Sequence, residues 1–295
     1  MKLQPAKSLE SSKALAQAKQ ILALNLEGVS NVGLDSLILL THALSLSKEQ
    51  IIFNPQQQLS EAEEKNFFDL VNRRAAREPI SHLIGKREFF GEDFLVTKDV
   101  LDPRPDSETL IESVLKKNLN PTQDLKILEL GVGSGCLIVT LLKAYVNAAG
   151  IAVDISKKAL AVAKKNSEKH QVSSRLKLLE SDLFSAVNRT EKFDLIISNP
   201  PYIPAADIEK LEPEVRIHEP RAALDGGADG LDFYRRIAAE AKNFLSESGK
   251  IFLEIGFGQK EEVVKIFTQQ EFTLTGLSLD LPGVERVLEF SSAAQ

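Results

Sequence analysis

The chain has 295 residues, of which 43% are hydrophobic and 26% are charged, a balance typical of a soluble globular protein. Its single cysteine excludes an intramolecular disulfide and fits a reducing cytosol. No apolar stretch approaches the roughly 20 residues that cross a bilayer, and residues 1–8 lack the apolar segment of a signal peptide. We therefore expect a cytoplasmic protein that does not bind a membrane.

The net charge of −6 is unevenly distributed along the chain. Residues 1–98 carry 12 basic and 12 acidic side chains, whereas the remainder carries 24 and 30. Dedicated DNA-binding domains usually have a basic excess, because phosphate contacts supply much of their affinity. Neither part of this chain has such an excess, so we expect no direct DNA binding.

Residues 1–85 predict a small all-α domain. Apolar residues recur at helical spacing in two segments, and a capping box precedes a third segment, which Pro79 ends. The two stripes are Leu15, Ala18, Leu22 and Leu26, with Gly28 as the expected stop, and Leu37, Leu40 and Leu44; the capping box is Ser60 with Glu63, ahead of Phe67, Phe68 and Val71. Residues 86–102 then predict a β-hairpin connector, with two short strands within 89–96.

Residues 103–295 predict a second domain in which strands and helices alternate, a pattern that favours a parallel sheet covered by helices on both faces. The expected strands are 126–130, 150–153, 176–179, 193–198 and 250–255, and the expected helices are 107–117, 135–146, 156–170 and 231–245. The end of the chain differs, because segments 273–279 and 286–290 flank Pro282-Gly283 and predict an antiparallel hairpin at the sheet edge.

The tetrapeptide Asn199-Pro200-Pro201-Tyr202 directly follows the apolar strand 193–198. It should therefore lie at the carboxyl end of that strand, where open α/β sheets bind their ligands. Two prolines stiffen the loop, which presents one amide side chain, free carbonyls and an aromatic ring. Such a loop suits a planar NH2 group and indicates methyl transfer to an amide or amino nitrogen.

A glycine-rich loop, Gly131-Val132-Gly133-Ser134-Gly135, joins an earlier strand to a helix. By itself it predicts only a tight turn, and its spacing differs from the dinucleotide fingerprint. Asp154 ends the next strand, where its carboxylate can accept hydrogen bonds from both ribose hydroxyls; alternatively it caps the helix near Ser156. Together the loop and Asp154 favour a ligand site.

A further acid ends the following strand. Asp182 could accept from the amino edge of an adenine and Leu183 could contact its face, although acids at strand exits often serve only turn chemistry. The chain lacks the lysine-containing phosphate loop of ATP sites. We therefore expect a nucleoside ligand, and S-adenosylmethionine fits the cofactor site of Gly131, Val132, Gly133, Ser134, Gly135, Asp154, Asp182, Leu183 and Asn199.

With these motifs, the chain resembles class I S-adenosylmethionine-dependent methyltransferases and, more closely, the release factor glutamine methyltransferase family (PrmC, also called HemK). Ser107 stands where that family often has threonine, and Glu129 where it often has aspartate. The resemblance covers nearly the whole chain and includes Arg77-Glu78-Pro79-Ile80, Gly85-Lys86-Arg87-Glu88-Phe89, Pro103-Arg104-Pro105-Asp106-Ser107-Glu108, and Glu214-Val215, Glu219-Pro220, Ala223-Leu224, Gly227 and Asp229-Gly230.

The resemblance implies a Rossmann-like domain with a mostly parallel seven-stranded sheet and an antiparallel C-terminal hairpin, preceded by a helical bundle. It also implies methylation of the side-chain amide nitrogen (N5) of glutamine in the Gly-Gly-Gln motif of peptide chain release factors. The helical domain and the connector would help to hold the release factor. From residues alone, the helical domain could equally serve stability or dimerisation. Glu219 would line the acceptor site.

The residues themselves suggest how the acceptor is held. Asn199 Oδ1 and the Pro200 carbonyl can each accept one N–H of the substrate amide, while Tyr202 packs on that amide and Pro201 stiffens the loop. Two other functions stay open. An adenine-N6 nucleic-acid methyltransferase would meet the same chemical problem, and a catalytically silent scaffold could bind the cofactor alone.

The remaining polar residues predict no metal site, since the histidines lack ligand spacing and the one cysteine cannot complete a zinc site. We expect His170 to be a helix-dipole or surface residue and Cys136 to fill a small buried space. Arg73, Arg74 and Arg77 form a short basic patch that could meet a release factor or ribosomal RNA, but a solvated helix face is the simpler interpretation.

Overall fold

The computed structural model describes residues 9–26, 31–117 and 120–292 of the chain. Gly28 and residues 1–8, on which two sequence expectations depend, lie outside this part. The chain divides into two compact units, one of residues 1–85 with 213–218 and one of residues 86–212 with 219–295. In the part described, no helix is both long enough and apolar enough to cross a membrane.

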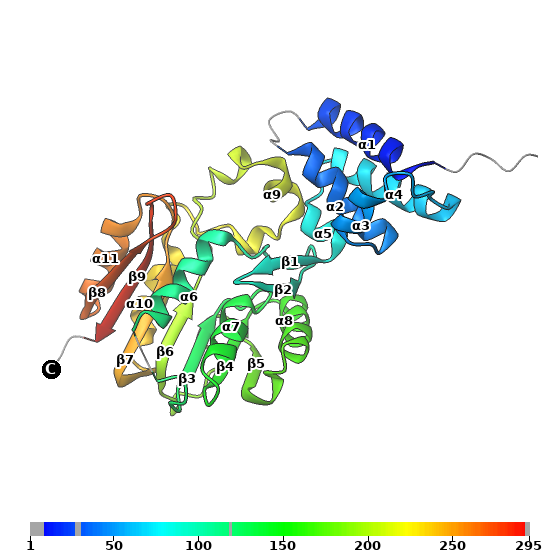
Figure 1. The fold of residues 1–295 in the computed structure, drawn as a ribbon. Helices are drawn as coiled ribbons and strands as arrows, with labels where there is room; N and C mark the ends of the chain where they lie inside the picture. The colour runs from blue at the N-terminus through cyan, green and yellow to red at the C-terminus, as the bar shows by residue number, and fades with distance from the viewer. Residues whose placement is uncertain (1–8, 27–30, 118–119, 293–295) are drawn as a thin grey trace, which may run out of the picture. The chain divides into compact units, whose positions relative to one another are not determined.

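The first unit is helical, as predicted. It contains α1 (Ser11–Asn25), α2 (Val32–Leu44), α3 (Lys48–Phe53), α4 (Glu61–Ala75), α5 (Ile80–Ile84) and α9 (Pro213–His218), shown in Figure 1. Its core joins Leu22 of α1, Leu40 of α2 and Phe67 of α4, all fully buried. In α1, Ala14 takes the fully buried place and Leu15 packs at the edge of the core.

The predicted capping box of α4 is confirmed. The Ser60 Oγ accepts from the Glu63 backbone N–H at 3.3 Å, and Glu63 Oε2 accepts from the Ser60 N–H at 2.8 Å. Two otherwise unpaired backbone donors are thereby satisfied at the helix start.

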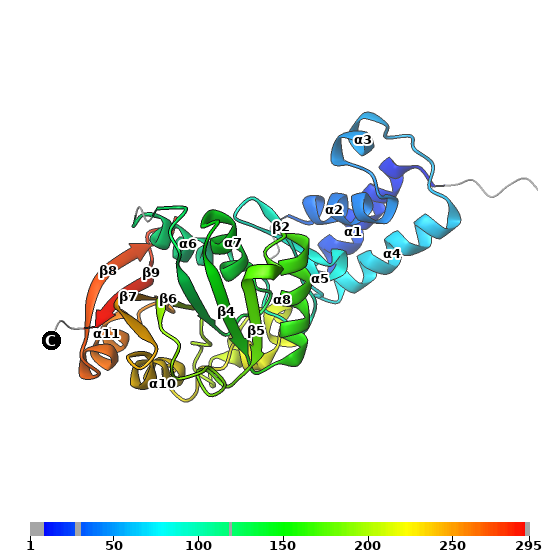
Figure 2. The ribbon, with the colours of Figure 1, turned by 90° about the horizontal axis from the view of Figure 1, so that it is seen from below.

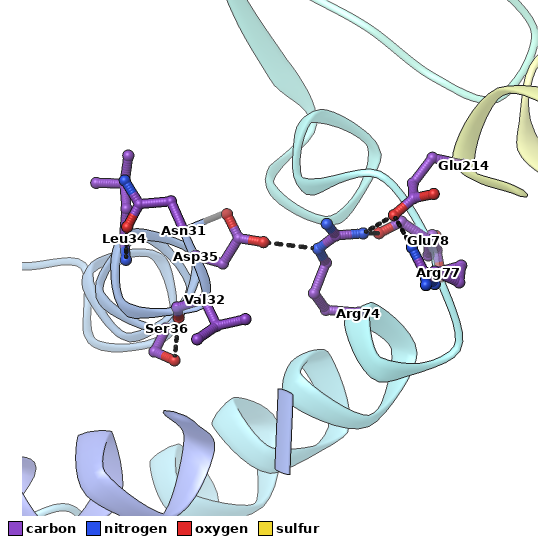
Figure 3. Close-up of polar contacts among 9 residues, drawn as sticks. All are labelled: Asn31, Val32, Leu34, Asp35, Ser36, Arg74, Arg77, Glu78 and Glu214. Atoms are coloured by element: carbon purple, nitrogen blue, oxygen red, sulfur yellow. Dashed lines mark hydrogen bonds and ion pairs between the residues drawn. The ribbon is translucent and has the colours of Figure 1, made fainter. Parts of the chain in front are cut away.

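The basic patch at the end of α4 is not simply a solvated face. The Arg74 side chain is only 7% exposed, and its guanidinium lies 2.8 Å from Asp35 Oδ2 and 3.0 Å from Glu214 Oε1 (Figure 3). Arg77 also reaches Glu214 Oε1, at 3.4 Å. Arg73 alone is largely exposed and pairs with Glu78. Arg74 therefore links α2, α4 and α9 within the helical unit, because it satisfies two carboxylates at once.

The second unit begins with a two-stranded antiparallel hairpin, β1 (Lys86–Phe89) and β2 (Glu92–Leu95). Its two turn residues, Phe90 and Gly91, have φ angles of +51° and +77°. Positive φ at both turn positions matches the twist of a tight hairpin. The predicted hairpin is present, but its first strand lies at Lys86–Phe89, almost wholly before the predicted range 89–96.

The main sheet of this unit has seven strands in the order β5-β4-β3-β6-β7-β9-β8. All neighbours are parallel except β9, which runs antiparallel to β7 and β8, so the predicted sheet and C-terminal hairpin are confirmed (Figures 1 and 2). The strands are β3 (Lys126–Leu130), β4 (Ala149–Asp154), β5 (Leu176–Glu180), β6 (Phe193–Ser198), β7 (Leu245–Glu254), β8 (Phe272–Leu279) and β9 (Glu285–Ser292).

Helices cover both faces of the sheet (Figure 2). One face carries α6 (Glu108–Leu115), α7 (Cys136–Ala144) and α8 (Lys157–Lys169), and the other carries α10 (Asp232–Ala241) and α11 (Lys260–Gln269). In β6, Leu195 and Ile197 pack in the core between the sheet and α6, α7 and α8, whereas Ile196 packs in the core on the opposite face, under α10 and α11. This alternation explains the continuous apolar run, because a central strand is buried on both sides.

The boundary between α10 and β7 also differs from the sequence prediction. The strand β7 begins at Leu245 and α10 ends at Ala241, whereas the sequence pattern predicts a helix to 245 and a strand from 250. Leu245 pairs with Phe193 of β6, and the Phe193 N–H donates to the Phe244 carbonyl at 2.8 Å. Pairing with the neighbouring strand therefore overrides the local helical pattern.

Candidate functional site

The predicted ligand residues meet at the carboxyl edge of the sheet, where β3, β4 and β6 end next to one another. A cavity of about 430 Å³ lies there. It is lined by the predicted Gly131, Val132, Gly133, Ser134, Asp154, Asp182, Leu183, Asn199 and Pro201. Gly135, Pro200 and Tyr202 are not in its lining.

The glycine loop has a shape that other residues rarely adopt. Gly131, Gly133 and Gly135 have φ angles of +75°, +52° and +82°. A Cβ on Gly135 would also lie 3.2 Å from the Ala163 Cβ of α8, so this glycine serves helix packing rather than ligand contact. Gly131 and Gly133 have open space on the Cβ side and line the cavity.

Asp154 is held by backbone donors on both sides. Its Oδ2 accepts from the Gly133 N–H at 2.9 Å and its Oδ1 from the Ser156 N–H at 2.8 Å. The N-cap of α8 is Ser156, whose hydroxyl accepts from the Ala159 N–H, so the alternative role of Asp154 as the cap is wrong. The carboxylate is partly exposed at the cavity and is oriented before any ligand arrives.

Glu129 forms part of the cavity wall next to Asp154. It is 1% exposed, and its Oε2 accepts from the Ile138 N–H at 3.1 Å. Burial raises the pKa of Glu129 well above its usual range, and the nearby Asp154 charge adds to this rise. Glu129 therefore contributes to the cavity wall a carboxyl group that favours its neutral form.

Asp182 and Leu183 differ in exposure. The Asp182 side chain is exposed and lies 2.7 Å from Arg236 of α10, while Leu183 is 7% exposed. Arg236 and Phe233, which the sequence pattern did not single out, also line the cavity. Both come from one helix that follows the tetrapeptide by some thirty positions, and no local motif announces them.

The amide of Asn199 has a defined orientation. Its Nδ2 donates to Ser107 Oγ at 3.1 Å, and within the described residues Oδ1 makes no hydrogen bond. Both Asn199 and Ser107 line the cavity. One N–H of the amide donates to Ser107, and the amide oxygen, which is the side chain's only acceptor, can accept a hydrogen bond from a ligand.

The chain after the tetrapeptide is braced by residues 224–230. Ile203 donates to the Leu224 carbonyl at 3.0 Å, and the Gly226 N–H donates to the Ile203 carbonyl at 2.9 Å. A Cβ on Gly226 would lie 2.8 Å from the Pro201 carbonyl oxygen and 2.9 Å from the Tyr202 Cα. This close backbone approach gives a physical reason for the small residues in this segment.

Tyr202 is directed toward a buried acid of the next strand. Its hydroxyl donates to Glu254 Oε1 at 3.5 Å, and its carbonyl accepts from Gln259 Nε2 at 2.9 Å. Burial raises the pKa of Tyr202, and the adjacent Glu254 raises it further. The phenol therefore stays neutral in the physiological range.

Arg104 and Glu219 form a close pair near the cavity. Arg104 Nη2 lies 2.7 Å and 2.6 Å from the two Glu219 carboxylate oxygens. Burial raises the pKa of Glu219 to about 7, although Arg104 opposes that rise. The cavity lining includes Arg104 and Pro220 but not Glu219, so the acid acts on the cavity through its arginine partner.

Two expectations for single residues are wrong in part or in full. His170 is the C-cap residue of α8, at the helix end as expected, but it is not a surface residue, because its side chain is 5% exposed and its ring lies 4.6 Å from that of Phe94 in the connector hairpin. Cys136 is partly exposed and lines the cavity rather than filling a closed space. Its pKa is raised to about 12 by burial, so it remains a thiol. No group of three or more His, Cys, Asp or Glu residues suited to a metal occurs in the part of the chain that the structure describes.

Comparison with known proteins places the chain in a family. Residues 13–85 match the family model of the PrmC N-terminal domain, and residues 105–227 match that of the methyltransferase small domain. The release factor glutamine methyltransferase of Geobacter sulfurreducens is 42% identical, over 89% of this chain and 90% of that protein. The chain belongs to the release factor glutamine methyltransferase family. The release factor glutamine methyltransferase of Agrobacterium fabrum is 38% identical over 95% of this chain and 96% of its own length.

Solved structures support the fold assignment for this member of the release factor glutamine methyltransferase family. A methyltransferase from Pyrococcus furiosus superposes with a TM-score of 0.52, at 17% identity, over 76% of this chain and all of that one. Identity this low supports the architecture of the sheet and its helices and nothing beyond it. The predicted Rossmann-like methyltransferase fold is therefore confirmed.

Proposed function

We propose that this protein transfers a methyl group from S-adenosylmethionine to the side-chain amide nitrogen (N5) of the glutamine in the Gly-Gly-Gln motif of peptide chain release factors. The proposal rests on family membership and on one observation in the site. The Asn199 amide nitrogen donates a hydrogen bond to Ser107 Oγ, and the amide oxygen can accept a hydrogen bond from a ligand in the cavity.

The cavity has features that fit the cofactor. Its volume of about 430 Å³ lies within the range of ligand sites. Asp154 offers a carboxylate that two backbone N–H groups already hold in place, which suits a ribose diol. S-adenosylmethionine would supply a methyl group activated by a sulfonium.

The chain's own task is to hold the acceptor nitrogen. An amide nitrogen is a poor nucleophile, because its lone pair is delocalised into the carbonyl. Asn199 Oδ1 and the Pro200 carbonyl each accept one N–H of the substrate amide, and Tyr202 packs beside it. Holding reactants in a near-attack geometry can lower a barrier by up to ~7–11 kcal/mol. The methylated amide then loses its proton readily, so no strong base is required.

The helical unit is proposed to help hold the release factor. Its residues 13–85 match the PrmC N-terminal domain, which supports this role. The acceptor is then a folded protein rather than a nucleic acid base, in keeping with the absence of a basic excess in the chain.

The decisive experiment uses methyl-labelled S-adenosylmethionine with three acceptors: a release factor, its Gly-Gly-Ala variant, and DNA. Label only on the Gln form supports the proposal. Label on DNA would favour adenine-N6 transfer, and no label with cofactor still bound would favour a scaffold.

The variant Asn199→Ala tests the site within the same assay. We expect it to abolish turnover while calorimetry shows nearly unchanged cofactor binding. Asn188→Ala, in an exposed turn of the same unit, is the matched control and should behave as the wild type. Wild-type turnover in Asn199→Ala would remove Asn199 from the mechanism.

A further inference from the structure

The side-chain amide of Gln259 joins three separate segments at the end of the tetrapeptide. Its Nε2 donates to the Tyr202 carbonyl at 2.9 Å and to the Gly230 carbonyl at 3.3 Å, and its Oε1 accepts from the Gly256 N–H at 2.9 Å. Both N–H groups and the oxygen of this one amide are therefore used at the same time. The sequence motifs do not single out Gln259.

Two glycines leave the space that this amide occupies. A Cβ on Gly256 would lie 2.8 Å from Gln259 Oε1 and 2.9 Å from Tyr202 Cδ2. A Cβ on Gly230 would lie 2.8 Å from Gln259 Nε2. A side chain at either position would displace the amide or the Tyr202 ring, because these approaches are closer than packed atoms allow. The amide is thus enclosed by the same three segments to which it is hydrogen-bonded.

The tetrapeptide depends on neighbouring side chains to hold it, because its two prolines have no backbone N–H to donate. At its first residue, Asn199 Nδ2 donates to Ser107 Oγ at 3.1 Å. At its last residue, the Tyr202 carbonyl accepts from Gln259 at 2.9 Å, whereas the Tyr202 hydroxyl lies 3.5 Å from Glu254 Oε1. Gln259 therefore supplies the shorter of the two side-chain hydrogen bonds that hold this end of the loop.

We propose that Gln259 is a positioning residue for methyl transfer. By holding the Tyr202 carbonyl, it keeps the Tyr202 ring and the Pro200 carbonyl in the orientation that receives the substrate amide. Gln259 is not among the residues that line the cavity, whereas Pro201 is, so Gln259 acts through the stiff loop and not on a ligand. This inference rests on the proposed function and deepens it.

The Gln259 side chain is separate from the start of α11. Backbone groups make that start: the Gln259 carbonyl accepts from the Val263 N–H at 3.0 Å, and the Gln259 N–H donates to the Gly256 carbonyl at 3.2 Å. Within the described residues, the side chain makes no capping hydrogen bond to the helix. Replacing the side chain should therefore leave the helix in place and remove only the contacts of the amide.

The first test compares single-turnover rates at saturating cofactor and saturating release factor. Gln259→Leu loses every hydrogen bond of the amide, and Gln259→Glu keeps its shape and one acceptor but cannot donate to the two carbonyls. Both should lower the rate by about 10- to 100-fold, the range expected when a reacting group is misplaced by up to about 1 Å, while calorimetry shows unchanged cofactor affinity. Gln269→Leu, at the exposed far end of α11, is the matched control and should keep the wild-type rate.

Two results of this test would overturn the inference. A wild-type rate in Gln259→Glu would show that donation to the Tyr202 carbonyl is not needed. A loss of cofactor affinity as large as the loss of rate would show that Gln259 supports the whole edge of the sheet and not the acceptor loop.

The second test needs no acceptor. The chain has three tyrosines, so NMR of protein labelled with 13C in the tyrosine rings gives three sets of signals, and those of Tyr202 are assigned by their loss in Tyr202→Phe. We expect Gln259→Leu and Gln259→Glu to shift or broaden the Tyr202 signals. The signals of Tyr145, which precedes the start of β4 and so lies away from the carboxyl edge, should not change. Unchanged Tyr202 signals in both variants would refute the inference. If they change but the wild type methylates no glutamine, the Gln259 contact stands and the proposed function fails.

Discussion

Replacement of Arg74 by methionine should loosen the helical unit selectively. The Arg74 guanidinium is nearly buried and pairs with Asp35 at 2.8 Å, with Glu214 at 3.0 Å and with the Glu78 carbonyl at 3.3 Å. Methionine keeps much of the side-chain volume but leaves Asp35 without its guanidinium partner and Glu214 with Arg77 alone. Breaking a buried pair costs about 3–5 kcal/mol. Because Asp35 and Glu214 are 15% and 19% exposed, water reaches them partly and we expect the lower end, about 3 kcal/mol.

Hydrogen exchange measured by mass spectrometry separates this effect from global unfolding, which is not two-state in a protein with two units. If the free energy of local unfolding falls by about 3 kcal/mol, hydrogen exchange in α2 and α4 should become roughly 100-fold faster. Peptides from β3 and β6 serve as an internal reference. Arg73→Met is the matched control, since the Arg73 side chain is 52% exposed and exposed pairs contribute at most about 1 kcal/mol.

Combining Arg74→Met with Asp35→Asn and Glu214→Gln should recover most of the lost protection, because the stranded charges are removed as well. Equal exchange in Arg74→Met and Arg73→Met would refute the reasoning that burial makes Arg74 different. So would a triple variant no better protected than the single one.

Three further predictions concern the second unit. Asp154→Ala should weaken S-adenosylmethionine binding by roughly 1–3 kcal/mol, measured by calorimetry, through loss of a charged acceptor; unchanged affinity would remove Asp154 from the site. Gly226→Ala should lower methyl transfer at least tenfold with cofactor affinity retained, because its Cβ would lie 2.8 Å from the Pro201 carbonyl; a wild-type rate would show that the loop can yield. Burial raises the folded-state pKa of Glu254 from 4.5 to about 7, so its contribution to stability is present below pH 4.5 and is lost as pH rises through 7. Hydrogen exchange in peptides of β7 should therefore show that the free energy of opening of Glu254→Gln gains about 2–3 kcal/mol relative to wild type between pH 5 and pH 8, and a constant difference would contradict this.

Much of the fold and part of the site follow from local patterns. The apolar run of β6 predicted a buried strand, and the capping box at Ser60 predicted the start of α4. These features depend on residues within a few positions of one another, so a single stretch of sequence contains the physical cause. The glycine loop and the tetrapeptide are predictable for the same reason: each follows a recognisable strand, and parallel strands end at a common edge.

The features that the sequence missed all depend on contacts between distant segments. Phe233 and Arg236 reach the cavity from α10 without any motif of their own. In the sequence, Arg74 belongs to a short basic run typical of a surface helix. In the structure it is buried in ion pairs with Asp35, 39 positions away, and with Glu214, 140 positions away. Likewise, nothing local signals that residues 213–218 belong to the helical unit.

The amino-acid sequence by itself determined the layered architecture, the glycine loop and a stiff loop with one amide at the end of β6. Periodicity and turn chemistry suffice for these, because they act over a few residues. The tertiary structure alone decided how that amide is turned. Ser107 lies 92 positions before Asn199, so only the tertiary structure brings its hydroxyl to 3.1 Å from Asn199 Nδ2.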